Sequence, residues 1–418
     1  MTTTAPDTML SYARRMDRSD GLAHYRRRFV ESDELLAYFD GNSLGRPPIA
    51  TAERMAQFVT DAWAGRLIRA WDEEWMELPF TIGDELAAAA LGAAPGQTFI
   101  GDSTTVLLYK LARAAIDARP ERTEIITDTD NFPTDRYLLQ GIAAERGCTI
   151  RWIQSDPASG VSLQQVQDAV SERTALVLLS HVSYRSGFLA DLPAITRAAH
   201  EAGALVLWDL CHSVGSVPMQ LDADEVDLAV GCTYKYLNGG PGAPAFGYVR
   251  SDLQPVLAQP IQGWMGAADV FLMDPEYQPA PGLRRFLSGT PAVLAMLPMR
   301  ETIAMIAECG IDAVRAKSLG LTSFAIELSD AWLAPLGVSL ASERDGARRG
   351  GHVTLSHPAM RVVTERLWSR NVIPDYREPG GLRVGLSPLT TSFEEVYRGM
   401  EAVRDTLREV LREQSGLQ

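Results

Sequence analysis

The sequence predicts an α/β protein, with a large domain on a mostly parallel central sheet and a small C-terminal α+β domain. Two observations lead to this fold class. From about Thr98 to Val249, short apolar runs alternate with longer amphipathic segments, which is the pattern of strands joined by helical crossovers. The runs are almost entirely apolar, as expected for strands buried on both faces. A chain of 418 residues is also long enough for two or three packed units.

The segments before this core are predicted to be mostly helical. A basic amphipathic segment near residues 12–30 comes first, and an extended piece with the sequence LAYFDGNSLG follows it. Helical periods then run from about Ile49 to Leu91. We expect residues 1–50 to pack with the small domain.

The core supplies seven strands within a large domain predicted over residues 51–305. Ligands bind at the carboxyl ends of the strands in such sheets, so the polar residues after each run are the candidates for chemistry. The predicted strands are QTFIGD, TEIIT, CTIRWI, TALVLLS, GALVLWD, VDLAVGC and APAFGYV.

An irregular Pro/Gly-rich region, residues 259–291, follows the core. It is too long for an ordinary connection, so we predict that it is functional. A helical pair over about residues 292–333 comes next. The small domain, predicted over residues 306–418, then combines short strands with helices near residues 359–370 and from Ser392 onward.

Charge and cysteine usage exclude several classes of function. A formal charge of −14 opposes binding to the phosphate backbone of a nucleic acid. The four cysteines show neither CxxC nor His-rich spacing, so we expect reduced thiols and no metal site. The chain shows no apolar core of a signal peptide, and no run approaches the roughly 18 apolar residues of a membrane span. We therefore expect a cytoplasmic protein that binds neither nucleic acid nor membrane.

The chain has only three lysines, and the rest of its 39 basic residues are arginines. Lys110 and Lys317 lie in helical periods, where a solvated side chain is the ordinary expectation. Lys235 instead follows a predicted buried strand, between two tyrosines and ahead of three glycines, in CTYKYLNGGPGAPAF. Partial desolvation there would favour a neutral amine that forms a Schiff base with a carbonyl cofactor. A structural lysine paired with a carboxylate is the alternative.

Asp209 ends the run ALVLWD, at a strand end where a sheet presents catalytic groups. Enzymes that use pyridoxal phosphate (PLP) need a lysine for the Schiff base and an acidic partner for the pyridine nitrogen. His212 would orient this carboxylate or the cofactor, or else is an ordinary loop histidine. Lys235 and Asp209 together therefore indicate a PLP site.

A phosphate cradle is predicted where the sequence DSTT, residues 102–105, follows the first core strand and opens a helix. Hydroxyls and free N–H groups would converge there, although an ordinary N-cap is the alternative. In DNFPTDRY, Phe132 either stacks on a flat cofactor, with Asp135 near a ring substituent, or packs into the core. The stretch from Gly240 to Ala245 formally matches GxGxxA but precedes a strand, which disfavours a nicotinamide dehydrogenase.

These motifs, with others, follow one another over about residues 38–389 in an order that resembles the kynureninase family. That family consists of fold-type-I PLP enzymes in the class-V aminotransferase superfamily. The strings that carry the resemblance are YFDGNSLGRPP, GDSTTVLLYK, DNFPTDRY, SHVSYRSG, WDLCHS, GCTYKYLNGGPGAPAF, GW, RFLSGTP and DYREPGGLRVGLSPL.

The resemblance implies a role for each matching residue. Lys235 would carry the cofactor, Asp209 would pair with the pyridine nitrogen, and Phe132 would stack on the ring. Arg383 would clamp the α-carboxylate of an amino-acid substrate. The other cofactor positions would be Ser103, Thr104, Thr105, Asp135, Ser180, His212 and Tyr234, with Trp264 and Thr290 reaching the phosphate from the neighbouring subunit of a homodimer. Asn42, Ser43 and Trp71 would contact the substrate, although a core tryptophan is the alternative for Trp71.

The activity implied by the resemblance is hydrolysis of the Cβ–Cγ bond of L-kynurenine or 3-hydroxykynurenine to L-alanine and an anthranilate. Lys235 would move the α-proton and Tyr234 would act as an acid. Such a reaction would serve tryptophan catabolism, NAD biosynthesis or secondary metabolism. This chain has Ala267, Ser183 and Thr390 where the family usually has His, Asn and an aromatic residue. A kynurenine with another ring substituent is therefore a further candidate substrate.

Other functions would share these features. A desulfurase-like lyase needs a reactive cysteine on a mobile loop, but the only cysteine after Lys235 is Cys309, in a helical period. A class-V aminotransferase stays open on the residues alone. A degenerate PLP-fold scaffold without chemistry is the alternative that is not an enzyme, and the joint presence of Lys235, Asp209 and the cradle argues against it.

Overall fold

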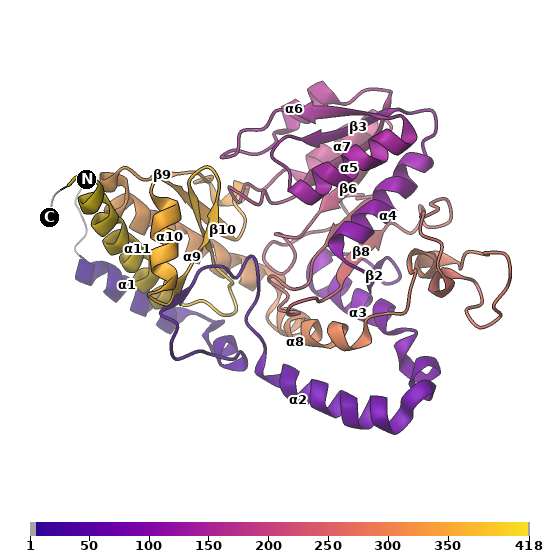
Figure 1. The fold of residues 1–418 in the computed structure, drawn as a ribbon, viewed down its shortest axis with the longest axis horizontal. Helices are drawn as coiled ribbons and strands as arrows, with labels where there is room; N and C mark the ends of the chain where they lie inside the picture. The colour runs from indigo at the N-terminus through magenta and orange to yellow at the C-terminus, as the bar shows by residue number, and fades with distance from the viewer. Residues whose placement is uncertain (1–5, 417–418) are drawn as a thin grey trace.

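A computed structural model describes residues 6–416, and its central element is a seven-stranded sheet (Figure 1). The strand order is β2-β8-β7-β6-β5-β3-β4. Strand β8 is antiparallel to both of its neighbours, and the other pairs are parallel. The bounds are β2 (Thr98–Gly101), β3 (Glu124–Asp128), β4 (Thr149–Ile153), β5 (Thr174–Ser180), β6 (Leu205–Asp209), β7 (Leu228–Gly231) and β8 (Ala245–Val249). All seven predicted strands and the mostly parallel sheet are thus confirmed.

Helices cover both faces of this sheet because alternate residues of a strand point to opposite sides. In β5, Leu176 and Leu178 pack in the core layer that contains residues of α4 and α5. Val177 and Leu179 pack in the layer that contains residues of α6 and α7. The bounds of these helices are α4 (Thr104–Asp117), α5 (Pro133–Arg146), α6 (Leu163–Ala169) and α7 (Leu192–Glu201).

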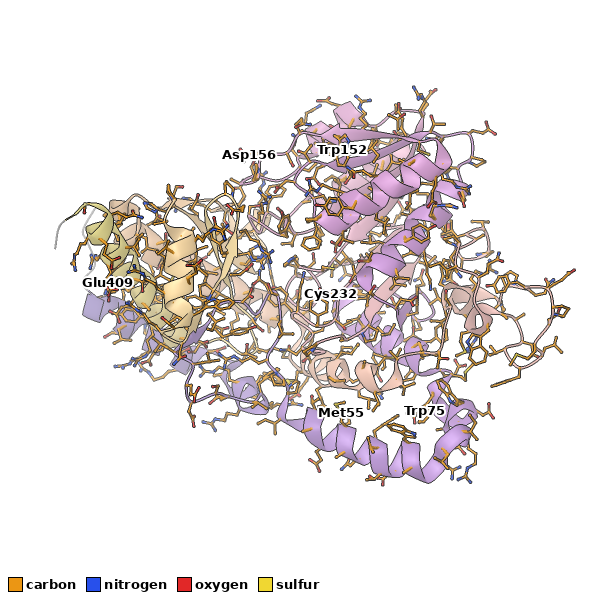
Figure 2. The ribbon with its side chains drawn as sticks, viewed as in Figure 1. Met55, Trp75, Trp152, Asp156, Cys232 and Glu409 are labelled. Carbon is orange, nitrogen blue, oxygen red and sulfur yellow. The ribbon has the colours of Figure 1, made fainter. Side chains whose placement is uncertain are left out.

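A second group of helices lies below the sheet in Figure 1 and begins with an arm that starts at α2. The arm continues through short 3-10 and π-helical turns as far as Trp75, which Figure 2 labels near its end. Helices α3 and α8 then pack under the sheet. Their bounds are α2 (Ile49–Gln57), α3 (Leu78–Leu86) and α8 (Val293–Cys309).

The C-terminal part has its own antiparallel sheet, in the order β12-β13-β10-β9. A separate apolar core fills the space between this sheet and helices α9, α10 and α11. The bounds are α9 (Ile311–Trp332), β9 (Ser339–Leu340), β10 (His352–Ser356), α10 (Met360–Trp368), β12 (Asp375–Arg377), β13 (Gly381–Gly385) and α11 (Phe393–Gln414). The predicted small α+β domain is therefore present.

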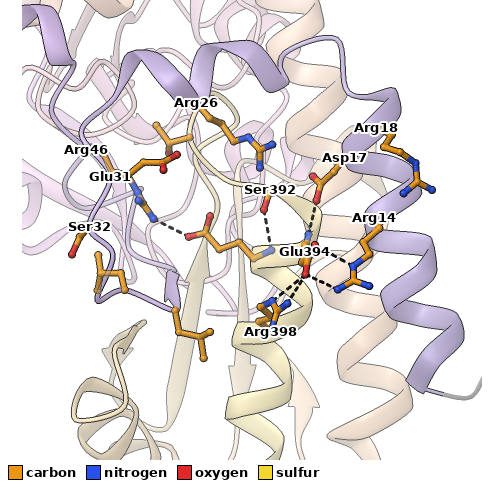
Figure 3. Close-up of a pocket in the computed structure, with 14 residues that line it drawn as sticks. Arg14, Asp17, Arg18, Arg26, Glu31, Ser32, Arg46, Ser392, Glu394 and Arg398 are labelled. Carbon is orange, nitrogen blue, oxygen red and sulfur yellow. Dashed lines mark hydrogen bonds and ion pairs between the residues drawn. The ribbon is translucent and has the colours of Figure 1, made fainter.

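The N-terminal segment contacts both parts of the molecule. Strand β1 (Ala37–Tyr38) pairs in parallel with β11 (Val372–Ile373) of the small domain. Helix α1 (Pro6–Ser19) is tied to the start of α11 by Asp17, whose carboxylate accepts hydrogen bonds from the backbone N–H groups of Phe393 and Glu394. Figure 3 draws the bond to Glu394. Tyr25, however, belongs to the core of the large domain. The boundaries at residues 50 and 305 stay predictions.

The region over residues 259–291 is irregular, as the sequence predicts. Its regular structure consists of two short 3-10 turns, Trp264–Gly266 and Gly282–Phe286. Across residues 6–416, no helix is both long and apolar enough to cross a membrane.

Candidate active site

One pocket brings together nine of the predicted cofactor residues. It lies at the carboxyl ends of the central strands and has a cavity volume of about 90 Å³. Figure 2 labels Cys232, three residues before Lys235, near the centre of the molecule. The lining residues are Thr104, Thr105, Phe132, Thr134, Asp135, Ser180, Tyr184, Asp209, Cys211, His212, Tyr234 and Lys235.

Lys235 is half-buried in the turn that follows β7. Its Nζ lies 3.0 Å from Nε2 of His212 and 6.0 Å from the ring centroid of Tyr234. Burial, and then the charge of Lys235, lowers the pKa of His212 well below its usual range. The imidazole is therefore neutral, and its Nε2 accepts a hydrogen bond from the lysine amine. The turn needs Gly239, because a Cβ there would lie only 3.0 Å from the carbonyl oxygen of Thr233.

Two acidic side chains approach the same pocket from different elements. Asp209 ends β6 and is 6% exposed, and its Oδ1 accepts the N–H of Cys211 at 2.8 Å. Asp135 lies in the first turn of α5, where burial, and then the nearby Asp209, raises its pKa well above the usual range. The pocket thus combines the carboxylate of Asp209 with a carboxyl group of Asp135 that tends to keep its proton.

The predicted phosphate cradle forms the N-terminus of the 14-residue helix α4. Ser103 is the N-cap residue, since its Oγ accepts the N–H of Val106 at 3.4 Å. For this residue the structure therefore shows the ordinary N-cap that was the alternative to a phosphate contact. The side chains of Thr104 and Thr105 line the pocket, and neither hydroxyl has a hydrogen-bond partner within residues 6–416. A helix N-terminus with two free hydroxyls suits a phosphate group.

Two aromatic side chains, Phe132 and Tyr184, line another side of the pocket. The half-buried Phe132 is the N-cap residue just before α5, and its ring meets that of Tyr184 edge-on, with centroids 5.3 Å apart. Ser180 ends β5 and donates a hydrogen bond to Oδ1 of Asn131 at 2.7 Å. Sequence reasoning did not assign roles to Tyr184 or Asn131. Both lie in the polar stretches after predicted strands, so strand-end position was the signal that could have found them.

Three of the predicted substrate residues gather beside this pocket. The guanidinium of Arg383, in β13, is 1% exposed and donates to the carbonyl of Tyr184 at 2.7 Å and to Oγ of Ser43 at 2.6 Å. It also pairs with Asp375 at 2.8 Å. Asn42 is fully buried, and neither atom of its amide has a partner in the described part of the chain.

Three predicted residues lie elsewhere in the subunit. Trp264 is 46% exposed and Thr290 is also exposed, and neither lines the pocket of Lys235. Trp71 lies against Trp75 at a centroid distance of 5.2 Å and lines a separate apolar pocket that includes Pro291. The fold of the single chain therefore does not bring these three residues to the pocket of Lys235.

Two of the three positions at which this chain departs from the family pattern line pockets of their own. Ser183 lines a pocket that shares Ser180 and Tyr184 with the main one. Thr390 lines the polar pocket in Figure 3, between the N-terminal segment and α11, which shares no lining residue with the main pocket.

The two remaining lysines are not solvated, so the ordinary expectation from helical periodicity is wrong for both. Lys110 is fully buried and pairs with Asp102, and Lys317 pairs with Asp20 at 2.7 Å, with both of those side chains 4% exposed. Each lysine is buried on its helix, and a carboxylate compensates its charge, from the turn before the same helix for Lys110 and from a distant segment for Lys317.

The residues of the main pocket fit PLP. Oδ2 of Asp135 and Nδ1 of His212 are buried without a hydrogen-bond partner within residues 6–416, as expected where a polar ligand supplies one. The amine of Lys235, the carboxylate of Asp209 and the helix N-terminus match the carbonyl, pyridine and phosphate parts of this cofactor. No group of three or more His, Cys, Asp or Glu residues suited to a metal ion occurs in the described chain.

Comparisons with known proteins show which family the chain resembles. The family described as "Kynureninase C-terminal domain" matches residues 314–403, and "Aminotransferase class-V" matches residues 87–339. The kynureninase of Pseudomonas fluorescens is 38% identical over 399 residues, which cover 94% of each chain. That of Burkholderia pseudomallei (strain K96243) is 41% identical with the same coverage.

Solved structures show the same fold at low sequence identity. A cysteine desulfurase from Thermococcus onnurineus NA1 matches with a TM-score of 0.80 and 18% identity, over 92% of this chain and 98% of that one. A C-DES mutant with glycine covalently linked to its PLP cofactor matches with a TM-score of 0.79 and 19% identity, over 91% and 99%. The predicted fold-type-I architecture is thereby confirmed. Given its near full-length similarity to curated kynureninases, the chain belongs to the kynureninase family.

Proposed function

We propose that this protein is a PLP-dependent hydrolase that cleaves the Cβ–Cγ bond of a kynurenine to give L-alanine and an anthranilate. The substrate is L-kynurenine, 3-hydroxykynurenine or another ring-substituted kynurenine. The observation that carries the proposal is the single pocket that joins Lys235, His212, Asp209 and the two free threonine hydroxyls. It occurs in a chain 38% identical, over 94% of its length, to a kynureninase.

Each side of the pocket would hold one part of the cofactor. Lys235 would bind its carbonyl carbon, Asp209 its pyridine nitrogen, and Thr104 and Thr105 its phosphate. Phe132 would pack on the ring. Bound PLP supplies an electron sink that stabilises negative charge on the carbon atoms next to the amino group of the substrate.

Proton transfer falls to Lys235 and Tyr234. The neutral His212 accepts a hydrogen bond from the lysine amine at 3.0 Å and so directs that amine while it takes and returns the proton at Cα of the substrate. Burial raises the pKa of Tyr234, so its phenol keeps a proton at neutral pH. Tyr234 is therefore suited to donate a proton to the carbon from which the anthranilate part departs.

Arg383 would bind the α-carboxylate of the substrate. Its Nε is buried and has no hydrogen-bond partner within residues 6–416, while Nη2 engages Ser43 and Asp375 and Nη1 donates to the carbonyl of Tyr184. A carboxylate would therefore bind at Nε and compete with Asp375 for the rest of the guanidinium. The amide of Asn42, without a partner of its own, is a further donor at this position.

We further propose a homodimer whose two active sites each use residues of both subunits. Trp264 and Thr290 are exposed away from the pocket of their own subunit. The same irregular region exposes three adjacent apolar side chains, between 61% and 69%, and such a patch favours association. These side chains are Phe271, Leu272 and Met273. Sedimentation velocity is expected to show a dimer, and a monomer with full activity would contradict the proposal.

A cytoplasmic location is also proposed, on the evidence of four free thiols. Cell fractionation would test it.

The proposed activity is tested by incubating the PLP-loaded protein with L-kynurenine and 3-hydroxykynurenine. The expected products are L-alanine and a fluorescent anthranilate in equal amounts. A protein that binds PLP but converts neither compound would show that the substrate is a different one. A keto acid product would instead show transamination.

A further inference from the structure

Lys110 is a buried charge that the proposed reaction does not use. It lies in α4, two turns after the phosphate cradle, with none of its side chain exposed. Its Nζ is 2.5 Å from Oδ2 of Asp102 and 2.9 Å from the carbonyl oxygen of Phe286. Burying an ammonium group is costly unless it is paired, so both contacts are needed to keep it inside.

The partner Asp102 holds the backbone turn from which the cradle is built. It has a φ of +47°, in the left-handed region that a residue with a side chain adopts only at a cost of about 1 kcal/mol. It directly precedes the N-cap Ser103, and its carbonyl accepts the N–H of Ala245 in β8 at 3.0 Å. A movement of this turn would therefore alter the direction in which the first N–H groups of α4 point.

The second contact of Lys110 reaches a different segment. Phe286 ends the 3-10 turn Gly282–Phe286, within the irregular region that also carries Trp264 and Thr290. In the proposed dimer, those two residues contact the phosphate in the neighbouring site. One ammonium group thus joins the cradle of its own site to the segment that serves the other site.

We propose that Lys110 is a positioning residue that fixes the phosphate cradle through Asp102 and anchors the inter-subunit segment through Phe286. This inference rests on the proposed function, because the phosphate it concerns is that of PLP. Lys110 lies behind the turn and acts only through these neighbours. Substitution of Lys110 should therefore weaken the binding of the phosphate group of the cofactor and leave the contacts to the pyridine ring unchanged.

A purely structural role predicts a different outcome, and the chain offers a matched control. Lys317 is the other buried lysine that pairs with a carboxylate, 2.7 Å from Asp20, and none of the pocket residues contacts this pair in the hydrogen bonds of the described chain. Lys317→Met removes a comparable ion pair at a distance from the cradle. It is expected to lower the melting temperature and to leave the affinity for PLP unchanged.

The experiment compares the dissociation constants of PLP and of pyridoxal, which lacks the phosphate, by absorbance titration of the cofactor-free protein. Lys110→Met and Asp102→Asn are each expected to weaken PLP binding about tenfold, within the usual range for coupled contacts, and to leave pyridoxal binding unchanged. Asn tolerates a positive φ, so Asp102→Asn removes the charge while it preserves the turn. The double variant should lose no more than Lys110→Met alone, because both changes break the contact between Lys110 and Asp102, and only Lys110→Met also removes the one with Phe286.

Two results would overturn the inference. Unchanged PLP affinity in both variants would do so, as would an equal loss of affinity for PLP and pyridoxal, which indicates general damage. If Lys110→Met does not fold, Asp102→Asn decides the question alone. Failure of the wild-type protein to bind PLP would instead overturn the proposed function itself, together with this inference.

Discussion

The role of Arg383 yields the most specific prediction about substrate recognition. The substitution Arg383→Lys keeps the positive charge but removes the planar fork that binds a carboxylate at two points. A hydrogen bond between charged groups contributes about 1.5–3 kcal/mol, and the lysine can retain one of the two. We therefore expect kcat/KM for L-kynurenine to fall about 10- to 150-fold.

The assay separates this effect from loss of stability. The inhibition constant of the amine that corresponds to kynurenine without its α-carboxylate should be unchanged in Arg383→Lys, because that compound has nothing for the guanidinium to bind. The affinity for PLP should also be unchanged.

Arg349 provides the matched control for this substitution. It is likewise 1% exposed, in the small domain, where it donates to Ser323 at 2.9 Å and to the carbonyl of Arg344 at 2.6 Å. Arg349→Lys should lower stability and leave kcat/KM as it is. The reasoning would be refuted if both variants lost kcat/KM equally, or if Arg383→Lys weakened the binding of the amine as much as that of kynurenine.

Three further predictions concern the lysine, the acid stability and the packing of the site. Lys235→Ala is expected to abolish turnover and the visible absorbance band of the purified protein, and a band that persists at the same wavelength would contradict its role. Burial lowers the pKa of His181 from 6.5 to about 3, so only the unfolded state takes up a proton between those pH values and stability falls as the pH falls. Between pH 7 and pH 5 the free energy of unfolding should fall by about 2 kcal/mol because of His181. In the His181→Phe variant, urea unfolding should show a correspondingly smaller fall over the same pH range. A Cβ at Gly385 would overlap Oδ1 of Asn42, so Gly385→Ala should displace this substrate residue and raise KM. Gly141 lies on α5 with open space around it, so Gly141→Ala should instead stabilise the protein by up to about 1 kcal/mol.

The strands were predictable because their signal is local. Strands buried on both faces are mostly apolar, and this pattern located the inner strands of the sheet. The edge strand β4 is the exception, since it contains Arg151 and is exposed at alternate positions. The chemistry at their ends was also predictable, since Lys235, Asp209 and Thr104 follow strands whose carboxyl ends meet at one edge.

The surroundings of the buried charges could not be predicted from local pattern. Lys110 and Lys317 show the periodicity of ordinary helical residues, and for Lys317 the partner Asp20 is brought in only by the tertiary structure. The same holds for Arg383, because its contacts with Ser43 and Tyr184 join segments that are about 340 and 199 residues apart. Trp71 and Thr290 lie away from the pocket of Lys235, and no local pattern in the sequence indicated this.

The central claim is hydrolysis of the Cβ–Cγ bond, and the fate of the attacking water tests it most directly. The PLP-loaded protein would be incubated with L-kynurenine in water enriched in ¹⁸O, and the products analysed by mass spectrometry. Hydrolysis predicts L-alanine without label and an equal amount of anthranilate with one ¹⁸O in its carboxylate. Formation of a keto acid, or of anthranilate without the label at early times, would contradict the account.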